Sequence, residues 1–268
     1  LKNDDIATGY KNDVVKAGGG DDWITDFGGK DRYDGGAGQD TLAFNAVKSA
    51  KHGVVANLAK GTVKGADGKL DKVVKIENVQ GTNQNDKLTG DRHGNDFWGL
   101  GGKDMINGGK GKDIVHYDHD AHFGGNRGVT VNLAKGKATD GFGKVDTLKA
   151  IEGAVGTDKA DRFIDNGQSN SFKGGAGDDT FIFTKGNDHA WGGAGADTFV
   201  FSGAKFGKDV VHDFQDGQDM LKVTGATSVA DLTIHAQGSD MLIDWNGNTI
   251  VLQGQAGATI DAADFIFV

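Results

Sequence analysis

The chain has no cysteine and no proline among its 268 residues, and these absences exclude several classes of protein. Without cysteine there is no disulfide framework, no thiol nucleophile and no metal site held by thiolates. Without proline, the 46 glycines do not indicate collagen or a Pro/Gly-rich disordered tract. No run of about 18 apolar residues predicts a membrane span. No basic segment followed by an apolar stretch opens the chain, so no N-terminal signal peptide is predicted.

Glutamate is also nearly missing. Of the 38 acidic residues only Glu77 and Glu152 are glutamate, and the rest are aspartate. Aspartate mixed with glycine suits tight turns and the ligation of hard cations. The net charge of −9 disfavours nucleic acid and anionic membranes as partners and favours cations.

Aspartate recurs every nine residues, and an apolar residue follows two positions later, as in Ile24, Ile106 and Phe181. This apolar residue is predicted to face the interior. Asparagine replaces aspartate in two of the fourteen nonapeptides, which form three blocks. The repeated positions are Asp4, Asp13, Asp22, Asp31 and Asp40; Asp86, Asn95, Asp104 and Asp113; and Asp161, Asn170, Asp179, Asp188 and Asp197.

A second repeat has an offset of 75 residues. Residues 53–82 align with residues 128–157, and the matches include Asp71 with Asp146 and Glu77 with Glu152. The alternating apolar residues at 129–133 predict a strand with one buried face. The two aligned segments are therefore predicted to be small β units inserted between nonapeptide blocks.

The segments GGAGQDTLA (35–43), GGAGDDTFI (174–182) and GGAGADTFV (192–200) resemble the nonapeptide of the RTX (repeats-in-toxin) family, G-G-x-G-x-D-x-U-x. The resemblance implies an all-β fold of right-handed parallel β-roll blocks, separated by short β inserts and closed by a C-terminal β cap. The predicted boundaries are 1–43, 81–116 and 156–201 for the blocks, 44–80 and 117–155 for the inserts, and 202–268 for the cap with a type I secretion signal.

The family further implies calcium ions between turns stacked eighteen residues apart. The lower turn gives its Asp and the carbonyls of positions two and four, and the upper turn gives its Asp and the carbonyls of positions one and three. Carried onto this sequence, the ligand sets are Gly18, Gly20, Asp22, Gly35, Ala37 and Asp40; Gly175, Gly177, Asp179, Gly192, Ala194 and Asp197; Thr157, Lys159, Asp161, Gly174, Ala176 and Asp179; and Thr82, Gln84, Asp86, Gly99, Gly101 and Asp104. With Asp4, Asp13, Asp31, Asp113 and Asp188 they predict roughly six to ten Ca²⁺ ions.

Two sites are predicted to be weaker or empty, because Asn95 opposite Asp113 and Asn170 opposite Asp188 remove a charge. The alternative interpretation is that all these turns hold no ion. Repulsion between stacked carboxylates disfavours it.

Other candidate groups are less specific. His116, His119 and His122 have a spacing that suggests zinc or copper, but we favour a polar loop. The four scattered tryptophans leave open a carbohydrate platform. Short helices are expected near 228–232 and 259–263.

The resemblance implies a secreted, calcium-binding bacterial protein that is not an enzyme, folds on export through a type I secretion apparatus and is located extracellularly or at the cell surface. Leu1 falls in mid-repeat, so we expect the natural N-terminus elsewhere. A structural surface protein (an S-layer, filament or adhesin) is the preferred hypothesis, with self-association or cell-surface polysaccharide as candidate contacts. Two alternatives remain. One is the C-terminal calcium-binding and secretion module of an enzyme (protease, lipase or polysaccharide-modifying), and the other is a carbohydrate-binding matrix protein.

The last five residues, 264–268, are predicted to be an export signal that also closes the fold. Phe265 and Phe267, or Ile266 alone, should be buried against strands at 241–243 and 249–252, because an exposed apolar strand invites aggregation.

Overall fold

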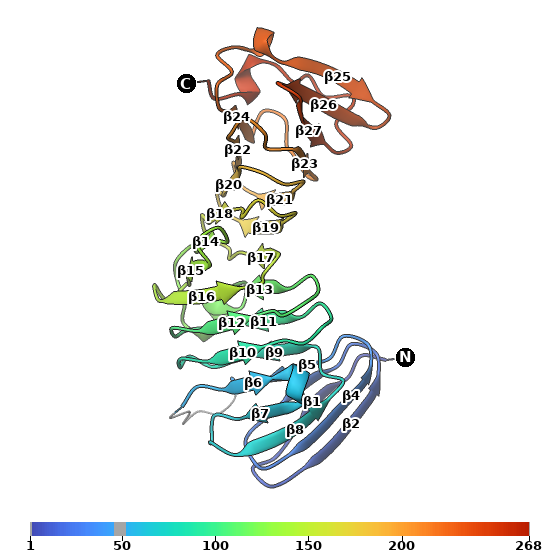
Figure 1. Cartoon of the computed structure of the whole chain (residues 1–268), viewed down its shortest axis with the longest axis vertical. Helices are drawn as coiled ribbons and strands as arrows, with labels where there is room; N and C mark the ends of the chain where they lie inside the picture. Colours follow the sequence, from blue (N-terminus) through green and yellow to red (C-terminus); the bar gives the residue numbers. More distant parts are fainter. Residues whose placement is uncertain (1, 46–51, 268) are drawn as a thin grey trace. The chain divides into compact units, whose positions relative to one another are not determined.

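A computed structural model describes residues 2–45 and 52–267, and almost all of its regular structure is β (Figure 1). The described residues include four short 3-10 helices and no α-helix, so the predicted all-β class is confirmed. None of these helices has the length and hydropathy needed to cross a bilayer. The contacts divide the chain into two units, Leu1–Asn126 with Ala138–Ile151, and Arg127–Lys137 with Glu152–Val268.

In the first unit successive nonapeptides alternate between two sheets whose repeat strands run parallel. The first sheet is ordered β1 (Asp5–Ala7), β3 (Trp23–Thr25), β5 (Thr41–Ala43), β9 (Asn78–Gln80), β11 (Asp96–Trp98), β13 (Ile114–His116). The second is ordered β2 (Val14–Gly19), β4 (Arg32–Ala37), β8 (Leu70–Val74), β7 (Thr62–Lys64), β6 (Val55–Asn57), β10 (Lys87–Thr89), β12 (Met105–Asn107), β16 (Val145–Lys149). Helices η1 (Leu58–Lys60) and η2 (Asp120–Phe123) lie in the connections.

The first insert is a three-stranded meander built into the second sheet. Strand β8 pairs parallel with β4, β7 pairs antiparallel with both β8 and β6, and β6 pairs parallel with β10. In the first sheet the same insert supplies only β9, which pairs directly with β5 and β11. The insert therefore leaves and re-enters the roll in register. Its residues 46–51 lie outside the described part of the chain.

The second unit also has its repeat strands divided between two sheets. Its first sheet is ordered β17 (Gly153–Val155), β19 (Ser171–Ala176), β21 (His189–Ala194), β23 (Lys208–Val211), β27 (Asn248–Leu252), β26 (Asp240–Trp245), β25 (Thr233–Gln237). Its second sheet is ordered β14 (Thr130–Asn132), β18 (Arg162–Ile164), β20 (Thr180–Phe183), β22 (Thr198–Phe201), β24 (Met220–Val223). Strand β15 (Lys137–Thr139) contains the point where the chain passes between units.

The repeated apolar residues form the core, as predicted. Leu88, Phe97 and Ile106 are at most 1% exposed, and Val129 and Val131 of the second insert are buried in the same way. In the second unit Phe163, Phe181 and Phe199 stack on one another, with ring centroids 5.1 and 5.0 Å apart. The eighteen-residue step therefore places identical side chains in direct contact.

The last part of the second unit is the antiparallel meander β25–β26–β27, which joins β23 through β27. Helices η3 (Val229–Asp231) and η4 (Ala262–Asp264) lie near the expected positions, with Ser228 and Asp261 as N-caps. Phe265 is buried, as expected for the chain end, while Phe267 is only half-buried. The backbone of this segment pairs with β24, since the Ile266 N–H donates to Leu221 O (2.8 Å). The packing of its side chains against the strands at 241–243 and 249–252 stays a prediction. Val268 lies outside the described residues.

Candidate calcium sites

Two columns of acidic and amide side chains follow the turns of each unit. The first column stands in the turns that lead into the first sheet, and the second column in the turns that lead into the second sheet. Within a column, the backbone N–H of one Asp donates to Oδ1 of the Asp eighteen residues later. The distances are 2.9 Å from Asp22 to Asp40 and 2.6 Å from Asp13 to Asp31. The predicted stacking of these pairs is confirmed.

Five members of the columns were not foreseen as site residues. They are Asp71, Glu77, Asp146, Asp209 and Asp219, whose side chains accept from the backbone N–H groups of Asp31, Asp40, Asp104, Asp188 and Asp197. Their spacings of 21 to 42 residues break the period because extra residues intervene. A signal was available, since a buried apolar residue follows each one two positions later, as Val73 follows Asp71 and Leu221 follows Asp219.

The members linked by these side-chain hydrogen bonds are as follows, and Glu152, whose O accepts from Asn170 Nδ2 (3.2 Å), holds the position of Glu77 in the second unit. The first column contains Asp4, Asp22, Asp40, Glu77, Asn95 and Asp113 in the first unit, and Asn170, Asp188 and Asp209 in the second. The second column contains Asp13, Asp31 and Asp71, then Asp86, Asp104 and Asp146 in the first unit, and Asp161, Asp179, Asp197 and Asp219 in the second.

The second carboxylate oxygen is the feature that fits a cation. In eight column residues Oδ2 is buried and accepts no hydrogen bond. Among the described residues, no Lys or Arg forms an ion pair with any of the eight. Buried anionic oxygens without a donor or counter-charge are very costly, so the arrangement requires a cation or a proton. The eight are Asp22, Asp40, Asp71, Asp104, Asp179, Asp188, Asp197 and Asp209.

Glycine at position one keeps open the space beside these oxygens. A Cβ atom placed on Gly174 would lie 1.9 Å from Asp179 Oδ2 and 2.6 Å from Gly192 O. At Gly35 it would lie 2.4 Å from Asp40 Oδ2, and at Gly99 2.5 Å from Asp104 Oδ2. A carboxylate and a carbonyl of the next turn therefore face one small space that a side chain would fill.

The carbonyls of positions two and four point toward the turn above. Gly18 O and Gly20 O would lie 2.0 and 2.1 Å from Cβ atoms on Gly36 and Gly38. Gly175 O and Gly177 O face the turn above them in the same way. The position-three carbonyls of Ala37 and Ala194 accept from Gly20 N (2.9 Å) and Gly177 N (2.8 Å), and each retains a second lone pair. These oxygens match the hard-ligand set that Ca²⁺ prefers.

The first turn of each later block differs from this pattern. The Thr157 N–H donates to Asp161 Oδ2 (2.5 Å) and its hydroxyl to Oδ1 (2.9 Å), while Val129 N–H also donates to Oδ1 (2.6 Å). Asp86 is held in the same way by Thr82 and Val54. The carbonyls of Lys159 and Gln84 face the turns that contain Ala176 and Gly101. Both carboxylate oxygens of Asp161 and of Asp86 therefore accept hydrogen bonds. In the turns above them, Asp179 and Asp104 each have a buried Oδ2 that accepts none.

Burial raises the pKa of several carboxyls in the second column. It raises that of Asp179 to about 8, with repulsion from Asp161 and Asp197 adding to the effect. It raises the pKa of Asp104 to about 10, where Asp146 and Asp86 add to it. These groups retain protons near neutral pH unless a cation replaces them.

The two asparagines contribute an amide where the other turns have a carboxylate. Asn95 Nδ2 donates to Glu77 O (2.7 Å), and Asn170 Nδ2 donates to Glu152 O (3.2 Å). Both glutamates belong to inserts and lie eighteen residues before the asparagine. The amide hydrogen therefore makes the link between turns at this level, while Asn95 Oδ1 accepts from Asp91 N (2.9 Å) within its own turn.

The histidine segment lies in an aromatic cluster. His116 and His119 stack on Trp98, with centroids 4.3 and 5.5 Å apart, and His119 Nδ1 is 2.8 Å from Gln80 Oε1. His122 packs edge-on against His119. Among the described residues, the one group of three metal-ligating side chains with convergent atoms contains no histidine.

Comparison with known proteins agrees with the geometry. Residues 7–42, 80–115, 155–190 and 184–203 match the family model described as RTX calcium-binding nonapeptide repeat (4 copies). The chain is similar to the extracellular lipase of Serratia marcescens, with 17% identity over 74% of this chain and 41% of the lipase and a TM-score of 0.29. It is also similar to a subunit of the Azotobacter vinelandii mannuronan C5-epimerase, with 23% identity over 41% of this chain and 80% of that one and a TM-score of 0.21. The chain thus spans well under two thirds of the lipase.

Proposed function

Because this chain belongs to the RTX calcium-binding repeat proteins, which are secreted by bacteria through type I systems, we propose that calcium folds it after export and that the folded chain is a structural component of the cell surface. The observation that carries the first part is the set of buried Asp Oδ2 atoms with no donor and no counter-charge. Bound calcium would supply the positive charge that these oxygens lack.

The residues of the columns explain why folding depends on calcium. In low calcium, Asp22, Asp40 and their equivalents face one another without compensation, so the compact state is disfavoured. The glycine-rich chain then remains extended enough to be exported. In millimolar calcium, binding to sites that exist only in the folded state adds its free energy to folding.

Circular dichroism tests this part. In EDTA at pH 8 the chain should give a mostly disordered spectrum, and millimolar Ca²⁺ should produce the β signal cooperatively. Mg²⁺ should substitute poorly, because it requires shorter octahedral geometry and retains its waters. A β spectrum in EDTA at pH 8, with an unchanged melting temperature, would overturn the proposal.

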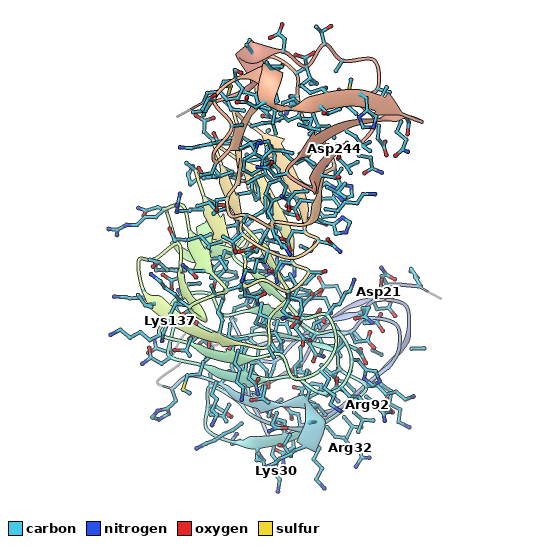
Figure 2. The ribbon with its side chains drawn as sticks, turned by 45° about the horizontal axis from the view of Figure 1, so that its top comes forward. Asp21, Lys30, Arg32, Arg92, Lys137 and Asp244 are labelled. Atoms are coloured by element: carbon cyan, nitrogen blue, oxygen red, sulfur yellow. The ribbon has the colours of Figure 1, made fainter. Side chains whose placement is uncertain are left out.

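The structural role is supported by the outer face of the second sheet in the first unit. Six apolar side chains there are 45–71% exposed. They alternate along the strands with basic side chains in a protein whose net charge is −9. Figure 2 labels Arg32 on this face. The apolar residues are Val14, Val55, Leu70, Val74, Met105 and Val145, and the basic residues are Lys16, Arg32, Lys64, Lys72, Lys87 and Lys149.

This basic and apolar face complements the acidic remainder of a second copy. A contact between two different surfaces builds an open filament or lattice when the rotation that relates the copies does not close into a ring. Sedimentation in calcium should show association that increases with concentration and weakens with salt. The single variants Lys72→Glu and Lys87→Glu should each weaken it, and Lys112→Glu, which makes the same charge change at an exposed turn, should not. A monomer at every concentration would overturn the structural role.

A further inference from the structure

Three carboxylates converge where the first block meets its insert. Asp26 follows β3, Asp31 stands in the turn before β4, and Asp71 lies in β8 of the insert. They are 1%, 3% and 1% exposed, and one carboxylate oxygen from each lies within 4.8 Å of the other two. The insert thus supplies one side of the cluster and the nonapeptide turn supplies the other.

Asp26 is out of place in a regular nonapeptide. It stands five residues before Asp31, at position one, where the turns around Asp40, Asp179 and Asp197 have glycine. In those turns a Cβ at position one would lie 1.9–2.4 Å from the Asp Oδ2, inside the space left for the cation. Here Asp26 places a third carboxylate at this position, and one of its oxygens converges with those of Asp31 and Asp71.

One oxygen of the cluster has no partner. Asp71 Oδ1 accepts from Asp31 N (2.8 Å), but Asp71 Oδ2 is buried and accepts no hydrogen bond. Asp31 Oδ1 accepts from Asp13 N (2.6 Å) and its Oδ2 from the Tyr33 hydroxyl (3.0 Å), and Asp26 Oδ1 accepts from Gly28 N. These donors fix the orientation of the carboxylates and do not neutralise them.

The charge around the cluster is uncompensated. The Lys69 ammonium in the hairpin of the insert lies 3.3 Å from Asp67 Oδ2, and no Lys or Arg among the described residues pairs with Asp26, Asp31 or Asp71. Asp67 itself approaches the turn, because its Oδ2 accepts from Gly29 N (3.0 Å). Three buried carboxylates in contact cannot all ionise without a cation among them.

We propose that Asp26, Asp31 and Asp71 form a three-carboxylate calcium site that joins the first nonapeptide block to its insert. It rests on the proposed function only in taking calcium as the cation. Its three negative charges distinguish it from the two-carboxylate positions of the columns. Because more ligand charge raises affinity for multivalent cations, this site fills first and favours trivalent lanthanides still more.

The test uses the full chain, freed of metal and titrated with Tb³⁺ alone and then with Ca²⁺ alone. Bound ions are counted by equilibrium dialysis, and terbium emission is excited through tyrosine, with the emission lost in Tyr33→Phe taken as the part excited through Tyr33. Asp26→Asn preserves the shape and the acceptor for Gly28 N while it removes the charge. Affinity at the tightest site should fall on the order of tenfold, and the Tyr33-excited emission should appear only at higher Tb³⁺.

Asp21→Asn is the matched control, since Asp21 is exposed, lies in the same block and accepts only from Gln39 N (2.8 Å). It should leave both readouts unchanged. Asp26→Gly restores the residue that regular turns have at this position, and it serves as a second variant if Asp26→Asn does not fold in calcium. It too should lose the tight ion while calcium still induces the β spectrum.

Unchanged ion number and affinity in either Asp26 variant would overturn the site, even with calcium-dependent folding intact. Failure of the proposed function has a different signature, because neither the wild-type chain nor any variant would then gain β structure with calcium.

Discussion

The two columns of the roll contain the same type of turn, but they differ in what offsets the repulsion between stacked side chains. The second column holds aspartate at every level, and buried oxygens without a donor, such as Asp179 Oδ2, call for a cation there, as Asp22 Oδ2 and Asp188 Oδ2 do in the first column. The first column substitutes Asn95 and Asn170 at the level directly after each insert, where an amide donates to a glutamate carbonyl. A cation and an amide hydrogen can thus occupy equivalent places in the roll. We therefore expect the two columns to differ in the number of ions on which each depends.

The largest expected effect is a reversal of pH dependence on removal of metal. In the metal-free folded chain burial raises the pKa of Asp179 to about 8 and that of Asp188 to about 7, from 3.8. The folded state then binds more protons than the unfolded state, so stability is present near pH 4 and is lost as pH rises through about 8.

With calcium the sign reverses, because protons compete with the ion for the same oxygens. Circular dichroism in EDTA should show more β structure at pH 5 than at pH 8, and calcium titrations should show a lower midpoint at pH 8. A metal-free chain whose stability increased with pH would contradict the account of both columns.

Next in size is Asp179→Ala in the second column. Asp179 stacks between Asp161 and Asp197, so its loss removes a ligand from two levels. The calcium midpoint of folding should rise about tenfold. Asp178→Asn is the control, because Asp178 is exposed and accepts only from Ala196 N (2.9 Å).

Asp113→Ala in the first column should raise the midpoint less, by about two- to threefold. Asp113 Oδ1 accepts from Asn95 N (2.8 Å), so the level below it already lacks a charge. Titrations of this variant and Asp179→Ala under the same conditions measure the contrast between the columns. Equal midpoints would show that the asparagine level binds as strongly as an aspartate level.

At saturating calcium the smallest effect is expected for Asn95→Asp, which converts one level of the first column into the form found in the second. The hydrogen bond from Asn95 Nδ2 to Glu77 O is replaced by repulsion between the new carboxylate and that carbonyl oxygen. The free energy of unfolding at low calcium should therefore fall by about 1–3 kcal/mol. At saturating calcium the added carboxylate becomes a ligand and the deficit should close. Urea unfolding at both calcium levels measures this, with Asn85→Asp as the control because its Oδ1 merely accepts from Lys103 N.

Much of the roll could be predicted from the sequence because the period fixes the register. A nine-residue step alternates strands between sheets, so Asp22 had to stack with Asp40 and Phe163 with Phe181. The entry of Asp71 into the second column was not foreseen, because a meander separates it by 40 residues from Asp31. The role of Asn95 depends on which backbone group lies below it, which no local pattern specifies.

The chain end shows a different limit. Phe265 was expected to be buried and is, yet its segment bonds to Leu221 of β24. Hydrophobicity predicts that such a segment is covered, but the choice of strand depends on which sheet edge the rest of the fold leaves unpaired.

The inserts have a consequence for how such a protein lengthens. The first insert follows β5 of the first sheet and leads into β9 beside it, while its three strands in the second sheet lie between the repeat strands β4 and β10. Matched strands such as β10 and β18 recur 75 residues apart. A gene segment encoding one such module can therefore be duplicated whole, since the new copy begins and ends on compatible edges. Ancestral recombination could have extended the protein by one block and one insert at a time, with each event adding ion sites and leaving the existing ones intact.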